Sequence, residues 1–441
     1  MTSTFNTDLT ESEAAGIQHF EKPGPTWTEA YGLDKGMVSL RDCWDPEFFE
    51  LEREAVFRRS WLYMGRVEEL PRAGSFFTRE RPFLNLSALI AKGMDNKVRA
   101  FHNVCAHRGN KLMWEDTAEK EMSGMCRQFA CKYHGWRYAL DGGVNYVHNA
   151  PEFFDLTDEN TRLREINCEV WAGFIFINLQ EKPAQSLREF LGEDVCKLES
   201  YPFDKMTHTY VIEGEVGSNW KLLMDAFQEL YHVPYVHSKM NAPGVPATGT
   251  DKVPFMMPMF KVFGKHRCYT SGGPYANRGV RGPRPLDRAF QSTFYGPERW
   301  ADVGDLGDGI NPGKVPNWGL DSWQIYPNLD ILMWNPNWYL TYEYWPIDAN
   351  RHRFIWTLFF APPRDARDRL SQEHTVLSVH EFAAQDVGAV EAMQAALKSG
   401  AIEEFHFNDQ EVLARHLHRV LQADVDAYVA EKAAEAGTGA K

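Results

Sequence analysis

Two short motifs in the first third of the chain place a cysteine close to a histidine. One residue separates Cys105 from His107, and two separate Cys131 from His134. Both pairs stand between runs of apolar residues, so we expect them in loops that connect strands. Two thiolates and two imidazoles suit either a zinc ion or an iron–sulfur cluster. The sequence therefore predicts a metal centre built from these four side chains.

The arrangement of the motifs favours a [2Fe–2S] cluster of the Rieske type over a structural zinc ion. Each loop supplies one cysteine and one histidine, so one iron can take both thiolates and the other both imidazoles. Gly109 and Gly135 follow the two pairs, and glycine lets backbone N–H groups approach the cluster sulfides. Cys126 lies outside this pattern, because three residues after it stands Phe129 and not a histidine. We interpret Cys126 as a buried thiol.

A second group of potential metal ligands lies in the segment DAFQELYHVPYVH, at residues 225–237. Two histidines, His232 and His237, together with a distant carboxylate, can hold Fe(II) and leave coordination positions open for O₂. On an unbroken helix, residues five apart would diverge by about 140°. Pro234 removes a helical hydrogen bond between them, so the helix should kink or end and turn His237 back toward His232. Two ordinary histidines near a helix end are the alternative.

The stretches CAHRG at 105–109 and CKYHGW at 131–136 resemble the α subunits of Rieske non-haem iron oxygenases of the ring-hydroxylating type. The resemblance extends over most of the chain. One departure is the spacing, since 23 residues lie between His107 and Cys131, more than this family usually has. The additional residues, around 114–124, are polar and acidic. We expect them to form a surface excursion of the first cluster loop.

The resemblance also implies the third iron ligand. The family takes it from an aspartate in a late helix, and the matching segment here is EFAAQDVGAVEAMQ, at 381–394. This match places Asp386 at the iron, with Glu381 and Glu391 as the competing carboxylates. Gln385 stands where many relatives have a glutamate, a departure with no evident consequence.

Two further acidic residues acquire roles from the same resemblance. An aspartate commonly bridges the iron-ligand histidine to a Rieske histidine of the adjacent subunit, and Glu229 occupies that position, three residues before His232. We therefore expect a bridge from His134 of a neighbouring subunit through Glu229 to His232. Asp225 stands where many relatives have an asparagine near the iron. Lying two helical turns before His232, it is expected to hydrogen-bond that histidine or an iron-bound water, with a surface or capping role as the alternative.

The hydrophobic pattern predicts an α+β protein with an all-β Rieske domain and a catalytic domain. Short apolar runs broken by Gly, Pro and Asn at 61–179 indicate strands, whereas the second half mixes strands and helices. We expect a large antiparallel sheet flanked by helices, of the helix-grip type, in the catalytic domain. The predicted division is an N-terminal arm and helix at 1–55 that packs with the catalytic domain, a Rieske domain at 56–182 and the catalytic domain at 183–441.

Several predicted elements position the candidate ligands. Asp45 and Pro46 indicate the start of a helix, and Ser218 is a plausible cap for a helix that carries the first iron ligand. The segment 240–320 is rich in Gly and Pro, and so long a loop is typically a lid or pocket wall. The predicted tail, helices and strands are a mobile tail at 1–24, helices at 45–60, 219–233, 366–398 (closed by Gly400) and 408–429, and strands at 208–216 and in the runs SWQIYP, LDILMWNP, WYLTYEYWPI and HRFIWTLFFAPP.

The composition indicates which kinds of partner the protein binds and in which compartment it is found. The net charge of −14 argues against nucleic acid, because phosphate binding needs a basic face. No apolar run reaches the roughly 18 residues of a membrane span, and the polar, acidic N-terminus lacks the order of a signal peptide. Seven cysteines are too few for a disulfide scaffold. We therefore expect a cytoplasmic protein.

No dinucleotide or nucleotide-binding glycine motif follows a predicted strand. Oxygen activation needs electrons, so a separate reductase, with or without a ferredoxin, should supply them. The resemblance implies a ring of three chains, as a homotrimer or as α3β3 with a small partner subunit.

The predicted function is that of a terminal oxygenase, which receives electrons at the Rieske cluster and activates O₂ at mononuclear Fe(II). An apolar aromatic or polycyclic substrate is the leading expectation, because adaptable apolar residues gather in the long loop and aromatic residues on the later strands. They are Phe255, Met256, Met257, Met259 and Phe260 in the loop, and Trp334, Trp338, Tyr339, Tyr342 and Trp345 on the strands.

Three alternatives remain. A monooxygenase or demethylase acting on a quaternary amine or a methoxy compound could hold its substrate in a cation–π cage. A Rieske electron carrier would need only the first domain, and a zinc-stabilised binding protein would be colourless. Iron content distinguishes an oxygenase from a Rieske electron carrier, since the oxygenase needs a third iron atom in each chain.

Overall fold

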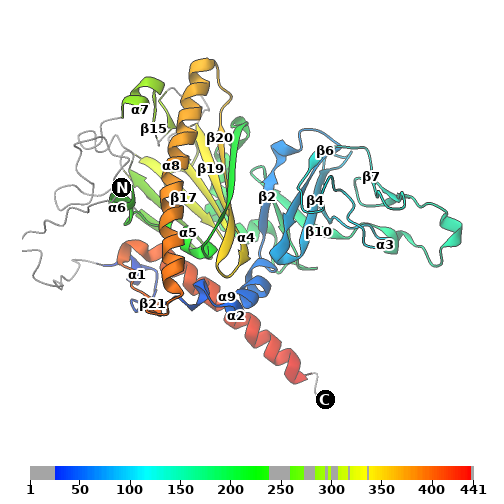
Figure 1. The fold of residues 1–441 in the computed structure, drawn as a ribbon, viewed down its shortest axis with the longest axis horizontal. Coiled ribbons are helices and arrows are strands. Elements are labelled where there is room, and N and C mark those ends of the chain that lie inside the picture. Colours follow the sequence, from blue (N-terminus) through cyan, green and yellow to red (C-terminus); the bar gives the residue numbers. More distant parts are fainter. Residues whose placement is uncertain are drawn as a thin grey trace, which may run out of the picture.

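The computed structural model describes residues 25–237, 259–272, 284–293, 296–298, 306–315, 318–334 and 337–438. In this part of the chain two seven-stranded antiparallel sheets dominate, one in each half of the sequence (Figure 1). Helices cover one face of the second sheet, toward one end of the molecule. The first sheet lies toward the other end. The predicted α+β class is confirmed.

The first sheet has the strand order β2-β11-β10-β5-β4-β3-β6. Its strands are β2 (Leu62–Arg66), β3 (Ser75–Arg81), β4 (Leu86–Lys92), β5 (Val98–His102), β6 (Ser123–Met125), β10 (Glu165–Trp171) and β11 (Phe174–Asn178). Beside it lies a three-stranded sheet of β7 (Phe129–Ala130), β8 (Arg137–Tyr138) and β9 (Val144–Tyr146), followed by the short helix α3 (Asp158–Thr161). Residues 115–120 are exposed, so the predicted excursion of the first cluster loop does lie at the surface.

The second sheet has the order β12-β20-β19-β18-β17-β14-β13. Its strands are β12 (His208–Val216), β13 (Met259–Phe263), β14 (His266–Gly272), β17 (Trp318–Ile325), β18 (Leu329–Trp334), β19 (Trp338–Asp348) and β20 (Arg351–Phe360). Alternate residues of a strand face opposite sides, so Leu340 and Tyr342 pack with the helices whereas Tyr339 points to the other face. Two small strands, β15 (Ser292–Thr293) and β16 (Gly296–Pro297), pair separately.

An aromatic core joins the two sheets on the face opposite the helices. Phe174 of β11 packs edge-on against Phe203, with ring centroids 5.0 Å apart, and Phe203 packs against Tyr339 of β19 at 4.9 Å. The helix α4 (Leu187–Cys196) contributes Leu187 and Leu191 to the same core. Because these apolar side chains are removed from water together, the two halves of the chain share one buried interface.

The predicted helix at 219–233 is wrong in its extent. The structure has α5 (Trp220–Ala226), then turns, then a second short helix α6 (Val233–Val236). The N-cap of α5 is Asn219 and not Ser218, since the Asn219 side chain accepts the backbone N–H of Lys221 at 3.0 Å. The chain therefore leaves the helix before His232 and enters a new helical turn directly after it.

Two long helices complete the helical layer, and both were predicted. The helix α8 (Ala366–Leu397) begins at the cap Asp365 and runs across the second sheet (Figure 1). The chain turns after it at Gly400, where φ is +65°. The helix α9 (Val412–Thr438) follows, and α7 (Pro285–Phe290) packs against α8.

The N-terminal segment lies against the second half of the chain. Backbone and side chain of Thr28, in α1 (Trp27–Ala30), donate to Asp409 Oδ1 at 2.9 Å, and β1 (Val38–Ser39) pairs with β21 (Glu404–Phe405). The helix α2 (Pro46–Glu52) begins as predicted at the cap Asp45. The expected tail at 1–24 lies outside the described residues.

Part of the predicted pocket wall also lies outside the described residues, including Phe255, Met256 and Met257. Within the part of the chain that is described, no helix combines the length and apolar character needed to cross a bilayer.

Candidate metal centres

The two cysteine–histidine motifs form loops of the same design. The first follows β5, and the second connects β7 to β8. In both, the glycine four residues after the cysteine donates its N–H to the cysteine carbonyl at 3.0 Å, from Gly109 to Cys105 and from Gly135 to Cys131. The two glycines have φ of +71° and +74°, a conformation that other residues adopt only with strain. The two loops therefore share one turn geometry, and each loop carries one cysteine and one histidine.

The histidines of these loops lie side by side. The His107 and His134 ring centroids are 4.6 Å apart, and His107 stacks on Trp136 at 5.0 Å. The Nδ1 atom of His107 is buried and has no hydrogen-bond partner among the described residues. Burial, reinforced by the neighbouring His134 and Arg108, lowers the pKa of His107. Its imidazole is thus neutral and able to donate a lone pair to a metal.

The cysteines of the two loops are buried. The Tyr138 hydroxyl lies 3.1 Å from Cys105 Sγ, and the Asn110 side-chain amide donates to Cys131 Sγ at 3.7 Å. Hydrogen bonds to ligand sulfurs are one means by which proteins tune iron–sulfur clusters. Cys126 is half-buried, and burial raises the pKa of its thiol to about 11. The two buried thiols and two paired imidazoles fit a [2Fe–2S] cluster with one cysteine and one histidine per loop.

The second centre brings together His232, His237 and Asp386 from two separated segments. The Nε2 atoms of His232 and His237 lie 3.4 and 3.2 Å from Asp386 Oδ1. One ligand atom from each residue falls within a common span of 4.8 Å. The two Nε2 atoms and Asp386 Oδ2 are buried without a hydrogen-bond partner among the described residues. Unsatisfied buried polar atoms are rare, and one metal ion in this position would satisfy all three.

The competing carboxylates are engaged elsewhere. Glu381 pairs with Arg284 at 2.9 Å, and Glu391 accepts the backbone N–H of Gly217 at 2.9 Å. Both side chains are exposed, whereas Asp386 is almost fully buried beside the histidine pair. The geometry therefore favours Asp386 as the third ligand.

Each histidine of this centre is oriented through its other ring nitrogen. Nδ1 of His232 hydrogen-bonds Glu229 Oε1, and Nδ1 of His237 donates to Gln385 Oε1 at 2.8 Å. These contacts place the proton on Nδ1 and leave the Nε2 lone pair for the metal. The sequence did not suggest this role for Gln385, which differed there only from the glutamate of many related proteins. Its position directly before Asp386 was the signal that could have suggested it.

Glu229 meets His232 in a turn and not on a helix. Its Oε2 atom accepts the backbone N–H groups of Tyr231 and His232, the latter at 3.1 Å. The carboxylate thereby holds the turn that leads into α6 as well as the imidazole. The expected contact between Glu229 and His232 is present, whereas the bridge to His134 of a neighbouring subunit needs a second chain and stays a prediction.

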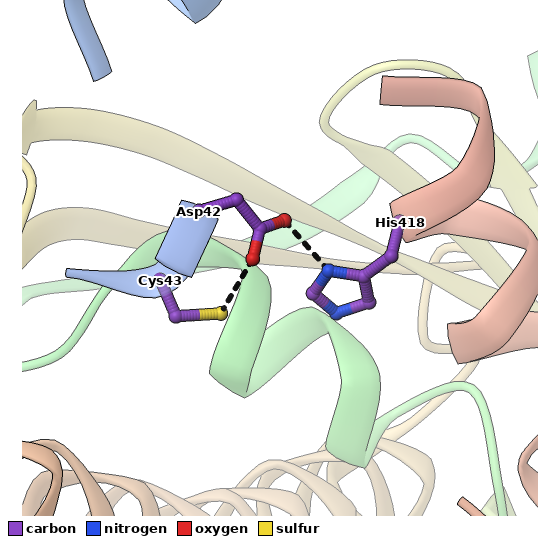
Figure 2. Close-up of side chains that lie close together, drawn as sticks. All are labelled: Asp42, Cys43 and His418. Atoms are coloured by element: carbon purple, nitrogen blue, oxygen red, sulfur yellow. Dashed lines mark hydrogen bonds and ion pairs between the residues drawn. The ribbon is translucent and has the colours of Figure 1, made fainter. Parts of the chain in front are cut away.

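The expected hydrogen bond from Asp225 to His232 is not formed. Because α5 ends at Ala226, the two residues do not share a helix, and Asp225 Oδ2 instead accepts from His418 Nε2 at 2.9 Å. His418 Nδ1 donates to Asp42 Oδ2 at 2.6 Å, and Cys43 Sγ lies 3.5 Å from the other oxygen of Asp42 (Figure 2).

This buried group does not resemble a second metal site, although Asp42, Cys43 and His418 lie close enough for one. Both ring nitrogens of His418 are used as donors to carboxylates. Burial alone would lower the pKa of His418, but Asp42 and Asp225 raise it to about 10. His418 is therefore an imidazolium between two carboxylates, with no lone pair to offer a metal.

Aromatic rings lie beside the candidate iron-ligand histidines. Phe382 stacks on His237 with centroids 3.8 Å apart, and Phe227 lies 4.6 Å from Tyr342 of β19. Of the five strand aromatics suggested as a pocket backing, Tyr342 reaches this region. Tyr339 does not, because strand alternation places it in the core between the two sheets.

Comparison with known families identifies both halves of the chain. The family model described as ring hydroxylating alpha subunit (catalytic domain) matches residues 203–427, and that of the Rieske [2Fe–2S] domain matches residues 60–158. The chain therefore belongs to the ring-hydroxylating alpha subunits, a family of Rieske-type oxygenases. It combines a Rieske [2Fe–2S] domain with a catalytic domain that binds mononuclear iron. The presence of both domains favours the oxygenase interpretation over the electron-carrier and zinc-protein alternatives.

Curated relatives cover part of the chain. The α subunit of methanesulfonate monooxygenase hydroxylase from Methylosulfonomonas methylovora is 32% identical over 47% of this chain and 51% of its own length. The carnitine monooxygenase oxygenase subunit of Escherichia coli K12 is 29% identical over 45% and 52%, and chloroplastic choline monooxygenase of Spinacia oleracea 30% identical over 44% and 43%. The chain spans about half the length of the curated relatives it matches.

Solved structures share the fold over a larger part of the chain. A quaternary ammonium Rieske monooxygenase superimposes with a TM-score of 0.67 and 20% identity, covering 88% of this chain and 95% of the other. Naphthalene 1,2-dioxygenase from Rhodococcus sp. superimposes with a TM-score of 0.68 and 18% identity, covering 88% and 94%.

Proposed function

We propose that this protein is the terminal oxygenase component of a Rieske monooxygenase that acts on a quaternary ammonium compound. The carnitine, glycine betaine and choline monooxygenases among its relatives carry this proposal. They support the quaternary-amine alternative better than the aromatic or polycyclic substrate that the sequence suggested. The likeness to naphthalene dioxygenase supports only the fold.

The charges around the iron ligands favour a cation over an anion such as methanesulfonate. The carboxylates Glu229, Asp225 and Glu411 interact in this region. The buried base Arg267 donates to Gln228 and lies near Asp330 and Asp225. A bound sulfonate would need a cation of its own, whereas a quaternary ammonium group can rest against aromatic faces. Phe227, Phe382 and Tyr342 are rings of the right kind.

The geometry supports a role for each candidate ligand. Cys105, His107, Cys131 and His134 would hold the [2Fe–2S] cluster, and His232, His237 and Asp386 would hold the Fe(II). When bound, these groups supply electron transfer and oxygen activation. Glu229 and Gln385 keep the two iron-ligand imidazoles in the tautomer that faces the metal. We propose that electrons arrive from a separate reductase, directly or through a ferredoxin.

A product screen tests the substrate class. The purified oxygenase, a surrogate reductase and NADH would be supplied with carnitine, glycine betaine or choline, and in parallel with methanesulfonate or naphthalene. We expect oxygen-dependent product with at least one quaternary amine. Hydroxylation of a carbon bonded to nitrogen gives a carbinol that separates into a tertiary amine and a carbonyl compound, so both are measured. Product from naphthalene alone would contradict the proposal.

A further inference from the structure

We propose that Asp42, His418 and Asp225 form a proton relay, which connects a surface groove with the Glu229 side of the iron centre. The inference rests on the proposed function, because a monooxygenase consumes protons. The balanced reaction is R–H + O₂ + 2 e⁻ + 2 H⁺ → R–OH + H₂O, with the electrons coming from the reductase. The two protons must reach a centre at which His237 and Asp386 are buried.

The relay is continuous through its first three members. Asp42 Oδ2 accepts from His418 Nδ1 at 2.6 Å, and Asp225 Oδ2 accepts from His418 Nε2 at 2.9 Å. An imidazole bonded through both nitrogens can release a proton from one and take up another at the other. The members come from the N-terminal 3₁₀ turn Arg41–Cys43, from α5 and from α9, which Figure 2 shows converging around Asp42.

The outer end of the relay meets solvent. A surface groove of about 740 Å³ between the N-terminal segment and α9 includes Asp42 and His418 in its lining. Arg415, Arg419 and Asp34 also line it. Water in the groove can therefore deliver a proton to Asp42, from which it passes to His418.

The inner end of the relay is Asp225. Asp225 Oδ1 is buried and has no hydrogen-bond partner among the described residues, so it is available to pass a proton onward. Glu411 interacts with both Asp225 and Glu229; burial, followed by these two carboxylates, raises its pKa to about 7. A carboxyl group of this kind exchanges protons at neutral pH. Beyond it, Glu229 hydrogen-bonds the iron-ligand His232.

Charged neighbours face the relay members from other elements. Lys221 on α5 pairs with Glu52 at 2.8 Å and interacts with Asp42. Arg267 on β14 interacts with Asp225. A structural ion pair would need neither an accessible end nor an unpartnered inner oxygen, because its function is complete when its charges are balanced. The groove and Asp225 Oδ1 therefore favour a relay.

The decisive variant is Asp225→Asn, which keeps the shape and can still accept from His418 but cannot carry a proton. Turnover would be compared in H₂O and D₂O, together with iron content and cluster absorbance. We expect filled metal sites, product formation reduced at least about tenfold and a larger solvent isotope effect. His374→Gln is the matched control: it breaks a buried His–Asp pair, to Asp287 at 2.9 Å, twelve residues and about 18 Å along α8 from Asp386.

Wild-type turnover and isotope effect in Asp225→Asn would overturn the relay, and so would loss of iron or of the cluster, which would make the triad structural. As an independent measurement, histidine-selective ¹⁵N NMR of the metal-free protein should show both His418 nitrogens protonated at pH 8. A neutral His418 ring would also overturn the proposal. Reoxidation of the reduced cluster by O₂ is followed in parallel without added substrate, so a wrong substrate class would be recognised separately from a failed relay.

Discussion

His237 is held by a side chain that does not itself contact the metal position. Gln385 accepts its Nδ1–H, and contacts of this kind typically contribute ten- to a hundredfold to metal affinity. We predict that Gln385→Leu, which fills the space but accepts no hydrogen bond, weakens Fe(II) binding by about tenfold or more. Chelator competition on the purified protein measures this. Gln385→Glu keeps an acceptor and should retain iron, and unchanged affinity in Gln385→Leu would contradict the assigned role.

Glu229 is predicted to couple the two centres. The change Glu229→Gln keeps the size but leaves a single acceptor oxygen in place of the two that now serve His232 and the turn. We expect both metal sites to remain filled, while product formation falls at least about tenfold, or about 1.4 kcal/mol in the barrier. A single-turnover experiment with pre-reduced protein measures it. Cluster reoxidation at the wild-type rate would show that Glu229 is not the bridge.

The residues that the sequence analysis could predict are those defined by local spacing. Cys105 and His107, or His232 and His237, form patterns that a few neighbouring positions reveal. Asp386 could be predicted only from the family resemblance, because His232 and His237 lie about 150 positions before it in the sequence. The contact of His418 with Asp225 joins residues 193 positions apart, and no local pattern marks it.

At the level of elements, strand-like apolar runs predicted β12 and β17 to β20, and Asp45 and Gly400 marked an end of α2 and of α8. The interpretation of 240–320 as one long loop was wrong for β13 and β14, which lie inside it and form an edge of the second sheet. The predicted helix at 219–233 extended too far, because α5 ends at Ala226. Proline explains an interruption near Pro234, but the chain leaves the helix already at Ala226, where Glu229 provides an alternative set of hydrogen bonds to Tyr231 and His232. Side chains that compete for backbone N–H groups end helices in ways that periodicity does not reveal.

The ion pairs of His418 join α9 to α5 and to the N-terminal segment, so they should stabilise the fold in a pH-dependent way. The pKa of His418 is about 10 in the folded protein and ordinarily 6.5. Its contribution to the free energy of unfolding is therefore complete below pH 6.5 and is lost as the pH rises through 10, by about 1.4 kcal/mol per pH unit.

We predict that wild type is more stable than His418→Gln below pH 6.5 and that the difference shrinks between pH 6.5 and 10. Urea unfolding of the two proteins over this range measures it. A difference that stays constant with pH would show that His418 acts through packing and not through its charge.

The two cluster loops depend on their matched glycines. Any other residue at position 135 would have to adopt a φ of +74°, which costs roughly 1–2 kcal/mol. To relieve this strain, the loop that carries Cys131 and His134 would shift. We predict that Gly135→Val lowers cluster occupancy, measured by visible absorbance and iron content per chain. Gly388→Ala is the control, since it lies in α8 with open space around its added Cβ. Full occupancy in Gly135→Val would show that the turn is not required.

On the scale of the whole molecule, the two centres lie far apart. β7, which leads into the second cluster loop, stands near one end of the longest axis, and α6 stands toward the other (Figure 1). Each region exposes aromatic side chains: Tyr133 and Phe154 beside the cluster loops, and Tyr231 and Tyr235 beside the iron ligands. Exposed apolar groups mark interaction surfaces. Two different surfaces that meet head to tail close into a ring when the rotation is three-fold.

Such a ring would let the cluster of one subunit serve the iron of its neighbour, and a mixing experiment tests this directly. Cys131→Ala should remove the cluster and His232→Ala the iron, so either variant alone is inactive. No subunit of a mixed assembly holds both centres, and transfer within one chain would therefore leave the mixture inactive. Transfer between neighbours requires a cluster on one side of a junction and iron on the other. Each mixed trimer has one such junction out of three, so isolated mixed trimers should recover about a third of wild-type turnover. Co-expression with two affinity tags isolates the mixed trimers, and the two variants purified separately and combined without reassembly provide the baseline. A mixed trimer as inactive as that baseline would contradict inter-subunit transfer.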